Sequence, residues 1–287
     1  MLHSLLALAV LLAGVFLAPI YDGLERKLRA AVHTRIGPPV LQTWYDLVKL
    51  FSKELIVPEG GSWCVLSVVL ELVALVASVA LLSYVPLTVS SGAVGAEVVA
   101  FIVLLTVATA LTIARAVSQN NVYSVVGGFR EFTLALSSEP FLIFSYLAIA
   151  TGGERFVLKL SSLLILAISA YVVSGRIPYD IAEAEPELSA GVNIELAGPL
   201  LGIATMSTVL KRLLAAELTA MALALVAGFE GYQALALALA LTPAVWVVHA
   251  LVSILLGRTR VDIAPKTLLL TLFPLCVVTI TIYGLGP

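Results

Sequence analysis

Five carboxylates lie within sixteen residues of one polar segment, and they are the sequence's main candidate for proton chemistry. The segment covers residues 176–199 and contains Asp180, Glu183, Glu185, Glu187 and Glu195, with Arg176 as its single base. Carboxylates this close raise one another's pKa, and partial burial raises it further. Such a group titrates as one coupled set and can exchange protons near neutral pH. A solvated acidic loop is the alternative that composition leaves open.

Four more carboxylates interrupt apolar stretches: Glu71, Glu97, Glu139 and Glu217. A charged side chain at the centre of a membrane helix costs roughly 2.5–3.5 kcal/mol on insertion scales, so it usually faces a bundle interior or a water-filled path. For Glu71 and Glu97 we expect interhelical hydrogen bonds or ion pairs. Glu139, in the sequence SSEP, and Glu217, six residues after Lys211, are expected on an ion path.

The composition predicts that helices in a membrane position these groups. Hydrophobic residues make up 61% of the 287 residues and charged residues 12%, whereas soluble domains have about 45–50% and about 25%. We therefore predict an all-α polytopic integral membrane protein with about eight transmembrane helices, forming a single domain over residues 1–287. The apolar runs are 2–21, 63–88, 94–117, 132–150, 157–175, 199–228, 232–256 and 267–286.

Two of these runs need comment. The first has no basic residue before it and no cleavage signal, so we expect a membrane helix in place of a signal peptide. The sixth is interrupted by Lys211 and Arg212. Its helix is expected to start at 199 or, alternatively, only near Ser207 after a shallow approach.

The basic residues divide unequally between the connections. We number the connections between the predicted helices in chain order. The odd-numbered connections and their flanks hold 14 of the 16 lysines and arginines, and the even-numbered ones hold Arg155 and Lys159. The positive-inside rule then places the odd connections in the cytoplasm and both termini outside, in a cell inner or plasma membrane. Two odd connections are long, at about 22–62 and 176–198. Long ordered connections are usually functional.

The first long connection contains a predicted amphipathic helix. Apolar side chains from Trp44 to Phe51 recur at helical spacing, and polar residues fill the remaining surface. The segment is too polar to span a bilayer, so we expect it to lie along the cytoplasmic interface.

Several other functions are excluded or disfavoured. A net charge of −2 argues against a generally basic nucleic-acid binder. The two cysteines and three histidines are widely separated, and no nucleotide-binding or hydrolase motif is present. We therefore expect no metal site and no cofactor bound by this chain.

A set of motifs resembles the membrane component of respiratory complex I that joins its two arms, the subunit 1 family, and the counterpart of that component in energy-converting membrane-bound nickel–iron hydrogenases. The motifs are Glu25-Arg-Lys, Arg35-Ile-Gly-Pro38, Asp46-Leu-Val-Lys-Leu-Phe-Ser-Lys-Glu54, Ser138-Glu139 and the acidic run from Arg176 to Leu188.

The resemblance implies a subunit that links a peripheral redox arm to an ion-translocating membrane arm. An acidic path would include Glu139, Asp180, Glu183, Glu185, Glu187 and Glu217. A chamber or partner interface would include Glu25, Arg26, Arg35, Asp46, Lys49, Arg130, Arg176 and Glu195. Partners would be peripheral hydrogenase-like and iron–sulfur subunits, antiporter-like membrane subunits and the bilayer, without nucleic acid. Iron–sulfur clusters, and nickel–iron in the hydrogenase branch, would lie in those partners.

Departures from the quinone-reducing branch favour a ferredoxin-linked, hydrogenase-like complex. Leu196 and Ala197 replace the usual aromatic and hydroxyl residues, and no aromatic precedes Glu139. A quinone-chamber subunit and a sulfur-reducing relative remain alternatives. A stand-alone secondary transporter and a passive anchor are alternatives of another class.

Overall fold

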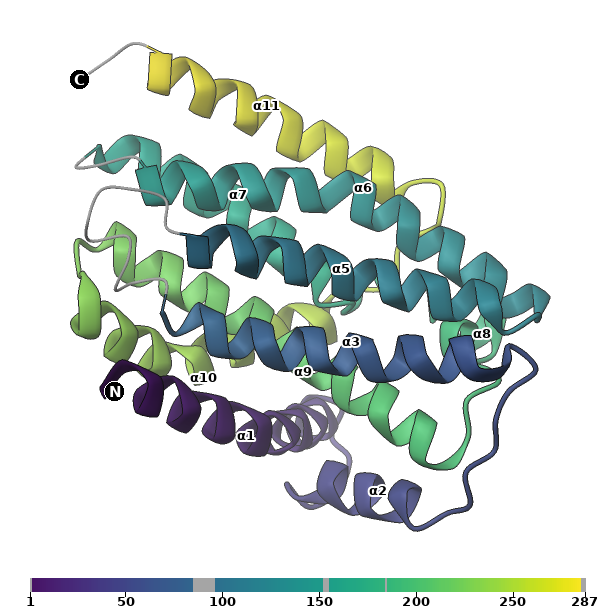
Figure 1. Cartoon of the computed structure of the whole chain (residues 1–287). Helices are drawn as coiled ribbons and strands as arrows, with labels where there is room; N and C mark the ends of the chain where they lie inside the picture. Colours follow the sequence, from purple (N-terminus) through teal and green to yellow (C-terminus); the bar gives the residue numbers. More distant parts are fainter. Residues whose placement is uncertain (1, 85–95, 152–154, 184, 285–287) are drawn as a thin grey trace.

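The computed structural model describes residues 2–84, 96–151, 155–183 and 185–284, and within these residues all regular structure is helical (Figure 1). The predicted all-α fold is therefore confirmed. The α-helices are α1 (Leu2–Val32), α2 (Gln42–Phe51), α3 (Gly61–Leu82), α5 (Ala96–Ser118), α6 (Val122–Thr151), α7 (Phe156–Val173), α8 (Glu185–Leu188), α9 (Gly198–Val226), α10 (Gly231–Leu255) and α11 (Ala264–Gly284). A 3-10 turn, η1 (Gly191–Asn193), lies in the connection between α8 and α9.

The long helices form a bundle with α9 at its centre. Helix α9 packs against α1, α2, α3, α6, α7 and α10, whereas α11 packs against α6 and α7. Leucine and alanine on every side let α9 bury most of its residues, since small and apolar side chains permit close approach all round. The start of α1 and the end of α11 lie at one end of the bundle, and α8 lies toward the other end (Figure 1).

Seven helices within the described residues are long and apolar enough to cross a membrane: α1, α3, α5, α6, α7, α10 and α11. Helix α9 has 29 residues, which gives ample length at about 1.5 Å per residue. It differs by carrying Lys211, Arg212 and Glu217. The predicted start of the sixth run at 199 fits α9, and the alternative start near Ser207 is wrong because α9 runs unbroken from Gly198 with a proline in its first turn.

Two helices extend beyond their apolar runs. Helix α1 continues eleven residues past the predicted end at 21, and α6 begins at Val122, ten residues before the predicted start at 132. Polar residues in these extensions find partners in the protein, so the helices do not stop where the hydrophobicity stops. Lys211 and Arg212, which the charge pattern assigns to the flank of an odd connection, lie in the middle of α9.

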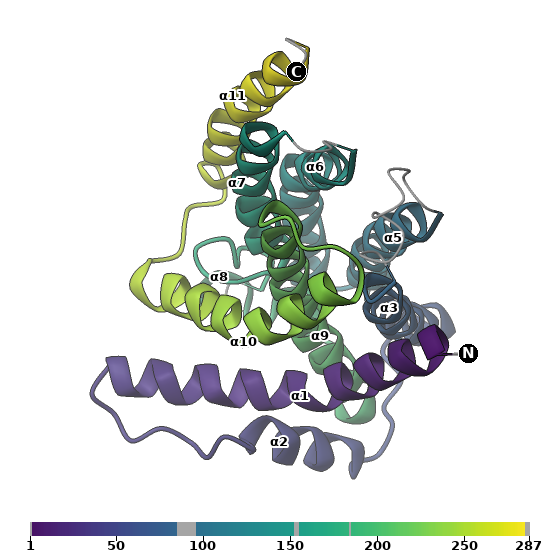
Figure 2. The ribbon, with the colours of Figure 1, turned by 90° about the vertical axis from the view of Figure 1, so that its left-hand side faces the viewer.

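Helix α2 confirms the predicted amphipathic helix. It buries Thr43 and Leu47 and packs against α1 and α9. In Figure 2, α1 lies across the lower side of the bundle with α2 directly beneath it. The segment before α2 passes so close to α1 that a Cβ on Gly23 would collide with the backbone oxygen of Val40. Glycine at position 23 therefore allows the first long connection to pack closely against α1.

Candidate functional site

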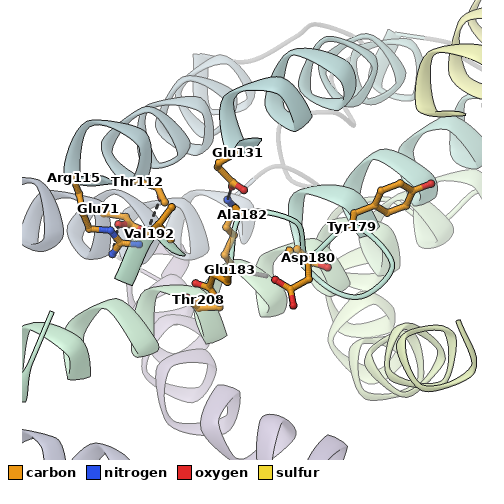
Figure 3. A pocket seen from close by; sticks show the side chains of 13 residues that line it. Glu71, Thr112, Arg115, Glu131, Tyr179, Asp180, Ala182, Glu183, Val192 and Thr208 are labelled. Carbon is orange, nitrogen blue, oxygen red and sulfur yellow. Dashed lines mark hydrogen bonds and ion pairs between the residues drawn. The ribbon is translucent and has the colours of Figure 1, made fainter. Parts of the chain in front are cut away.

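A cavity lies where the 174–197 connection meets α3, α5, α6 and α9 (Figure 3). Its volume of about 40 Å³ leaves room for a few water molecules. We call it the acidic cavity. Its lining contains four carboxyl groups and two cations among the described residues: Glu71, Glu131, Asp180, Glu183, Arg115 and Lys211.

Two carboxylates of the acidic cavity are held by ion pairs between helices. Glu71 of α3 lies 3.0 Å from Arg115 of α5, and both side chains are almost fully buried. The hydroxyl of Thr112 donates a hydrogen bond of 2.9 Å to Glu71. Glu131 of α6 lies 2.8 Å from the ammonium of Lys211 on α9. The predicted interhelical role of Glu71 is thus confirmed, and these pairs neutralise one half of the acidic lining.

The other two carboxylates come from the predicted acidic segment. Asp180 lies 2.8 Å from Arg258, which follows α10. Glu183 forms no ion pair within the described part of the chain; it accepts a hydrogen bond of 2.6 Å from the Asn193 amide. Burial raises the pKa of the Asp180 carboxyl, and Arg258 opposes that rise. Burial also raises the pKa of the Glu183 carboxyl, and the negative charge of Asp180 raises it further. Glu183 is therefore the group of the cavity best suited to bind and release a proton.

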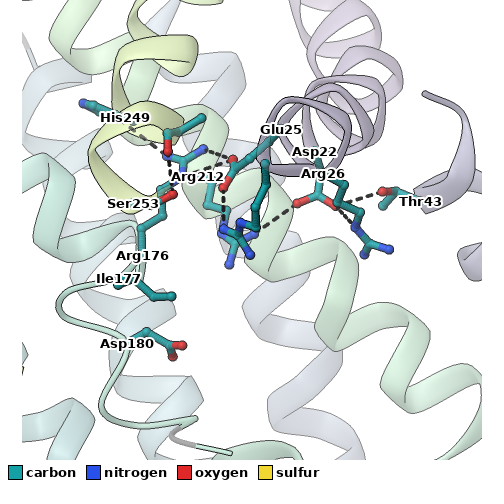
Figure 4. Close-up of polar contacts among 12 residues, drawn as sticks. Asp22, Glu25, Arg26, Thr43, Arg176, Ile177, Asp180, Arg212, His249 and Ser253 are labelled. Carbon is teal, nitrogen blue, oxygen red and sulfur yellow. Dashed lines mark hydrogen bonds and ion pairs between the residues drawn. The ribbon is translucent and has the colours of Figure 1, made fainter. Parts of the chain in front are cut away.

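A second polar cluster joins α1 to the rest of the bundle (Figure 4). The guanidinium of Arg176, directly after α7, lies 3.0 Å from Glu25 of α1. The guanidinium of Arg212 lies 3.0 Å from Asp22, one turn earlier on α1. The two charges of the pair between Arg176 and Glu25 are desolvated, and such a pair holds only if both partners are present.

The same cluster reaches α2. Arg26 lies 3.0 Å from Asp22 and 2.9 Å from Asp46 of α2. The Thr43 hydroxyl donates a hydrogen bond of 2.8 Å to Asp22. The structure therefore brings together the predicted residues Glu25, Arg26, Asp46 and Arg176, and it adds Asp22 and Arg212.

Arg176 also contacts α10. Its guanidinium lies 4.5 Å from the centre of the Trp246 ring, a cation–π arrangement, and 3.5 Å from Nδ1 of His249. The guanidinium can only donate, so Nδ1 accepts and the ring carries its proton on Nε2. His249 is thus a buried neutral partner of Arg176.

The two carboxylates predicted in mid-membrane are buried at separate places. Glu139 of α6 lines an apolar cavity of about 300 Å³ between α5 and α6. One of its oxygens, Oε1, is buried without a hydrogen-bond partner in the described part of the protein. Glu217 of α9 lines a small cavity beside α1, α3 and α10, facing Gly14 of α1.

The remaining predicted residues lie nearer the surface. Arg130 lies 2.7 Å from Glu187, whose side chain is 59% exposed. Glu195 is exposed and accepts a hydrogen bond of 2.6 Å from Asn121. Arg35 and Lys49 are exposed. The side chain of Glu185 falls outside the described side chains. These positions suit contacts with other chains better than a buried path.

Sequence reasoning did not assign a site role to five residues of these clusters: Asp22, Glu131, Lys211, Arg212 and His249. A signal was present for two of them. Adjacent cations at 211 and 212 in an otherwise apolar run require buried acidic partners, because an unpaired charge there is costly. Asp22 and Glu131 lay at the polar ends of apolar runs, where charge is common and gives no such signal. No group of three or more histidine, cysteine or acidic side chains has metal-ligand geometry within the described ranges.

Comparisons with known proteins identify the family of the chain. The sequence profile of the NADH dehydrogenase family matches residues 4–284. The chain is 32% identical to hydrogenase-4 component C of Escherichia coli over 92% of its own length and 86% of that protein. It is 27% identical to formate hydrogenlyase subunit 4 of the same organism, covering 92% and 93% of the two chains.

The other similarities are more partial or more distant. Identity to NADH-ubiquinone oxidoreductase chain 1 of Lampetra fluviatilis is 29%, over 68% of this chain and 65% of that one. A chain in the structure of an archaeal membrane-bound sulfane sulfur reductase superposes with a TM-score of 0.78 at 21% identity, covering 97% of this chain and 98% of that one. That likeness shows a shared fold.

Proposed function

The chain belongs to the NADH dehydrogenase family as a membrane subunit of the complex I subunit 1 type, and from this membership we propose that it links a peripheral redox arm to an ion-translocating membrane arm. In this role it couples electron transfer to the movement of protons or sodium ions. The redox cofactors, iron–sulfur clusters and in this branch nickel–iron, would belong to the peripheral partners. Antiporter-like subunits would continue the path through the membrane.

The state of Glu183 is the observation that carries the proposal. It is a carboxyl without an ion pair among the described residues, in a cavity whose other three carboxyls have cationic partners. Its raised pKa makes its charge responsive to a nearby electron. A passive anchor has no use for such a group, because buried carboxylates cost folding energy.

The relatives favour the hydrogenase-like branch over the quinone branch. The proteins named as components of hydrogenase-4 and formate hydrogenlyase match over 92% of the chain, whereas the ubiquinone oxidoreductase chain of Lampetra fluviatilis matches over 68%. We therefore propose that the chain is part of a ferredoxin-linked, hydrogenase-like complex. A sulfur-reducing complex is the alternative. A chain in the structure of an archaeal sulfane sulfur reductase has the same fold.

The mechanism proposed is electrostatic. Arrival of an electron in the peripheral arm makes the face of the acidic cavity more negative and raises the proton affinity of Glu183. Asp180 and Glu183 respond together, because the charge of Asp180 raises the pKa of Glu183. The change then reaches Glu139 and Glu217 inside the membrane. The exposed residues Arg35 and Lys49 are available for contact with the peripheral arm.

Affinity purification of the tagged chain tests this proposal. A linking subunit is expected to copurify with a peripheral subunit carrying the cysteine pairs that ligate nickel and iron, and with antiporter-like subunits. Isolation of the chain alone in a form that moves ions in vesicles would contradict the proposal and favour a secondary transporter. Copurification with a catalytic partner that lacks those cysteine pairs would support the linking role and contradict the assignment to the hydrogenase branch.

A further inference from the structure

Helix α9 carries two adjacent cations that serve different sides of the molecule. Arg212 pairs with Asp22 on α1. Lys211 points to α6, where its ammonium lies 2.8 Å from Glu131. Successive residues of a helix are about 100° apart around its axis, so the two side chains extend toward different neighbouring helices. Lys211 is the cation that lies between the acidic cavity and the membrane part of α6.

Two acidic side chains line the acidic cavity beside Lys211, and a third lies deeper on α6. Glu131 of α6 and Glu71 of α3 line the acidic cavity together with Lys211. Glu139 lies eight residues after Glu131 on α6, about two helical turns deeper, and its charge and that of Lys211 act on each other. Glu71 already has Arg115 as a partner. Glu131 therefore holds the Lys211 ammonium, and Glu139 is the next carboxyl along α6.

These two carboxyls are not equally satisfied. Glu131 holds the ammonium in a hydrogen-bonded ion pair. Glu139 is 9% exposed, and its Oε1 is buried without a partner in the described structure. A buried carboxyl without a cation is more stable protonated, whereas an adjacent ammonium favours its ionised form. An ammonium that moved from one carboxyl to the other would therefore change which of the two is stabilised as an anion.

We propose that Lys211 is a moving cation that alternates between Glu131 at the cavity and Glu139 in the membrane. The inference rests on the proposed coupling function and names the residue that carries charge from the cavity into α6. A lysine suits this task because its ammonium is a point charge on a flexible four-carbon stem.

Protons are conserved in each step of the exchange. Glu131 takes a proton from the acidic cavity and loses its negative charge. The ammonium of Lys211 leaves it and pairs with Glu139, whose proton passes to the next acceptor along the membrane path. When Glu131 releases its proton to the cavity, the ammonium returns and Glu139 takes its proton back from that acceptor. Lys211 remains protonated throughout and acts as a positioning residue.

The test uses the intact complex in inverted membrane vesicles, with ions translocated per electron as the readout. Lys211→Met is expected to reduce this ratio by at least about tenfold, because an adjacent cation changes the proton affinity of a carboxyl by at least about that factor. Electron transfer to methyl viologen in the peripheral arm should remain at the wild-type level. Lys159→Met is the matched control, because the Lys159 ammonium hydrogen-bonds the Leu225 backbone oxygen at the other end of α9, and it should leave the ratio unchanged.

A double variant separates a moving cation from a structural ion pair. Glu131→Gln with Lys211→Met leaves no uncompensated charge in this pair, so it should assemble even where the single variant does not. If Lys211 moves, the double variant stays uncoupled, and the infrared band of the protonated Glu139 carboxyl, assigned with Glu139→Gln, no longer changes with reduction. A coupled double variant with a redox-sensitive band would overturn the inference.

The proposed function and this inference fail in different ways. Loss of coupling in Glu183→Gln with full coupling in Lys211→Met would contradict the moving cation and still support the coupling role. Full coupling in both variants would remove the coupling role itself.

Discussion

Arg176 and Glu25 stand 151 positions apart in the sequence and 3.0 Å apart in the fold, with 1% and 4% of their side chains exposed. The pair connects the start of the acidic segment to the long first helix. Through α1 it is also connected to α2, since Asp22, one turn before Glu25, and Arg26, the next residue, both bind α2. The two long connections are therefore joined through α1.

Removing one partner of this pair should destabilise the protein strongly. Glu25→Gln leaves the buried Arg176 guanidinium without its ion-pair partner, which costs about 3–5 kcal/mol. The free energy of unfolding, measured by denaturant titration in mixed micelles, checks this. The control is Arg260→Ala, which removes a surface pair with Asp262 whose side chains are 79% and 58% exposed, and should change stability by about 0–1 kcal/mol. Equal effects of the two changes would contradict the structural role given to Arg176.

A methyl group at position 23 should detach the first long connection from α1. Gly23→Ala places Cβ against the Val40 backbone oxygen, and backbone cannot yield as a side chain can. We expect faster proteolysis between residues 33 and 41. Gly257→Ala is the control, because a Cβ there meets nothing within 4 Å. Unchanged protection of the segment in Gly23→Ala would show that α1 and this segment are packed differently.

The protonation of Glu183 should depend on pH in a defined direction. Its pKa is raised by burial, so the folded protein holds this proton at pH values above about 4.3, the ordinary glutamate value. The folded state is then favoured at low pH, and this contribution is lost as pH rises through the raised pKa. Infrared titration should show a protonated carboxyl band above about pH 4.3 that is absent in Glu183→Gln. Titration of Glu183 at the ordinary glutamate pKa would contradict the assignment.

The buried and exposed acids should differ in their effect on coupling. Neutralising Glu139 and Glu217 together, as Glu139→Gln with Glu217→Gln, is expected to abolish ion translocation, because both are buried within the bundle. Glu187→Gln should have little effect, since that side chain is 59% exposed. Ion uptake by inverted vesicles compares the variants. Full translocation after the double change would favour a passive anchor.

The sequence was sufficient to predict most membrane helices and α2. Hydrophobicity determines where a helix can cross a bilayer, and helical spacing of apolar residues identifies an amphipathic helix. It did not predict that α1 reaches Val32, because the polar residues of that extension are stabilised by contacts with α2, α9 and the acidic segment.

Pairing within the site was beyond the sequence for a related reason. Composition indicated that Lys211 and Arg212 need acidic partners, but the choice of Glu131 and Asp22 depends on how α9 is rotated in the bundle. Likewise, the carboxylates of residues 180–195 read as one group, whereas the fold divides them. Asp180 and Glu183 line the cavity, and Glu187 and Glu195 are exposed.

The coupling role is tested most directly by the number of ions translocated per electron in inverted vesicles containing Glu183→Gln complex. Loss of the carboxyl that lacks an ion pair in the described cavity should lower this ratio several-fold, while electron transfer in the peripheral arm to an artificial acceptor stays at the wild-type level. An unchanged ratio in that variant would contradict the account.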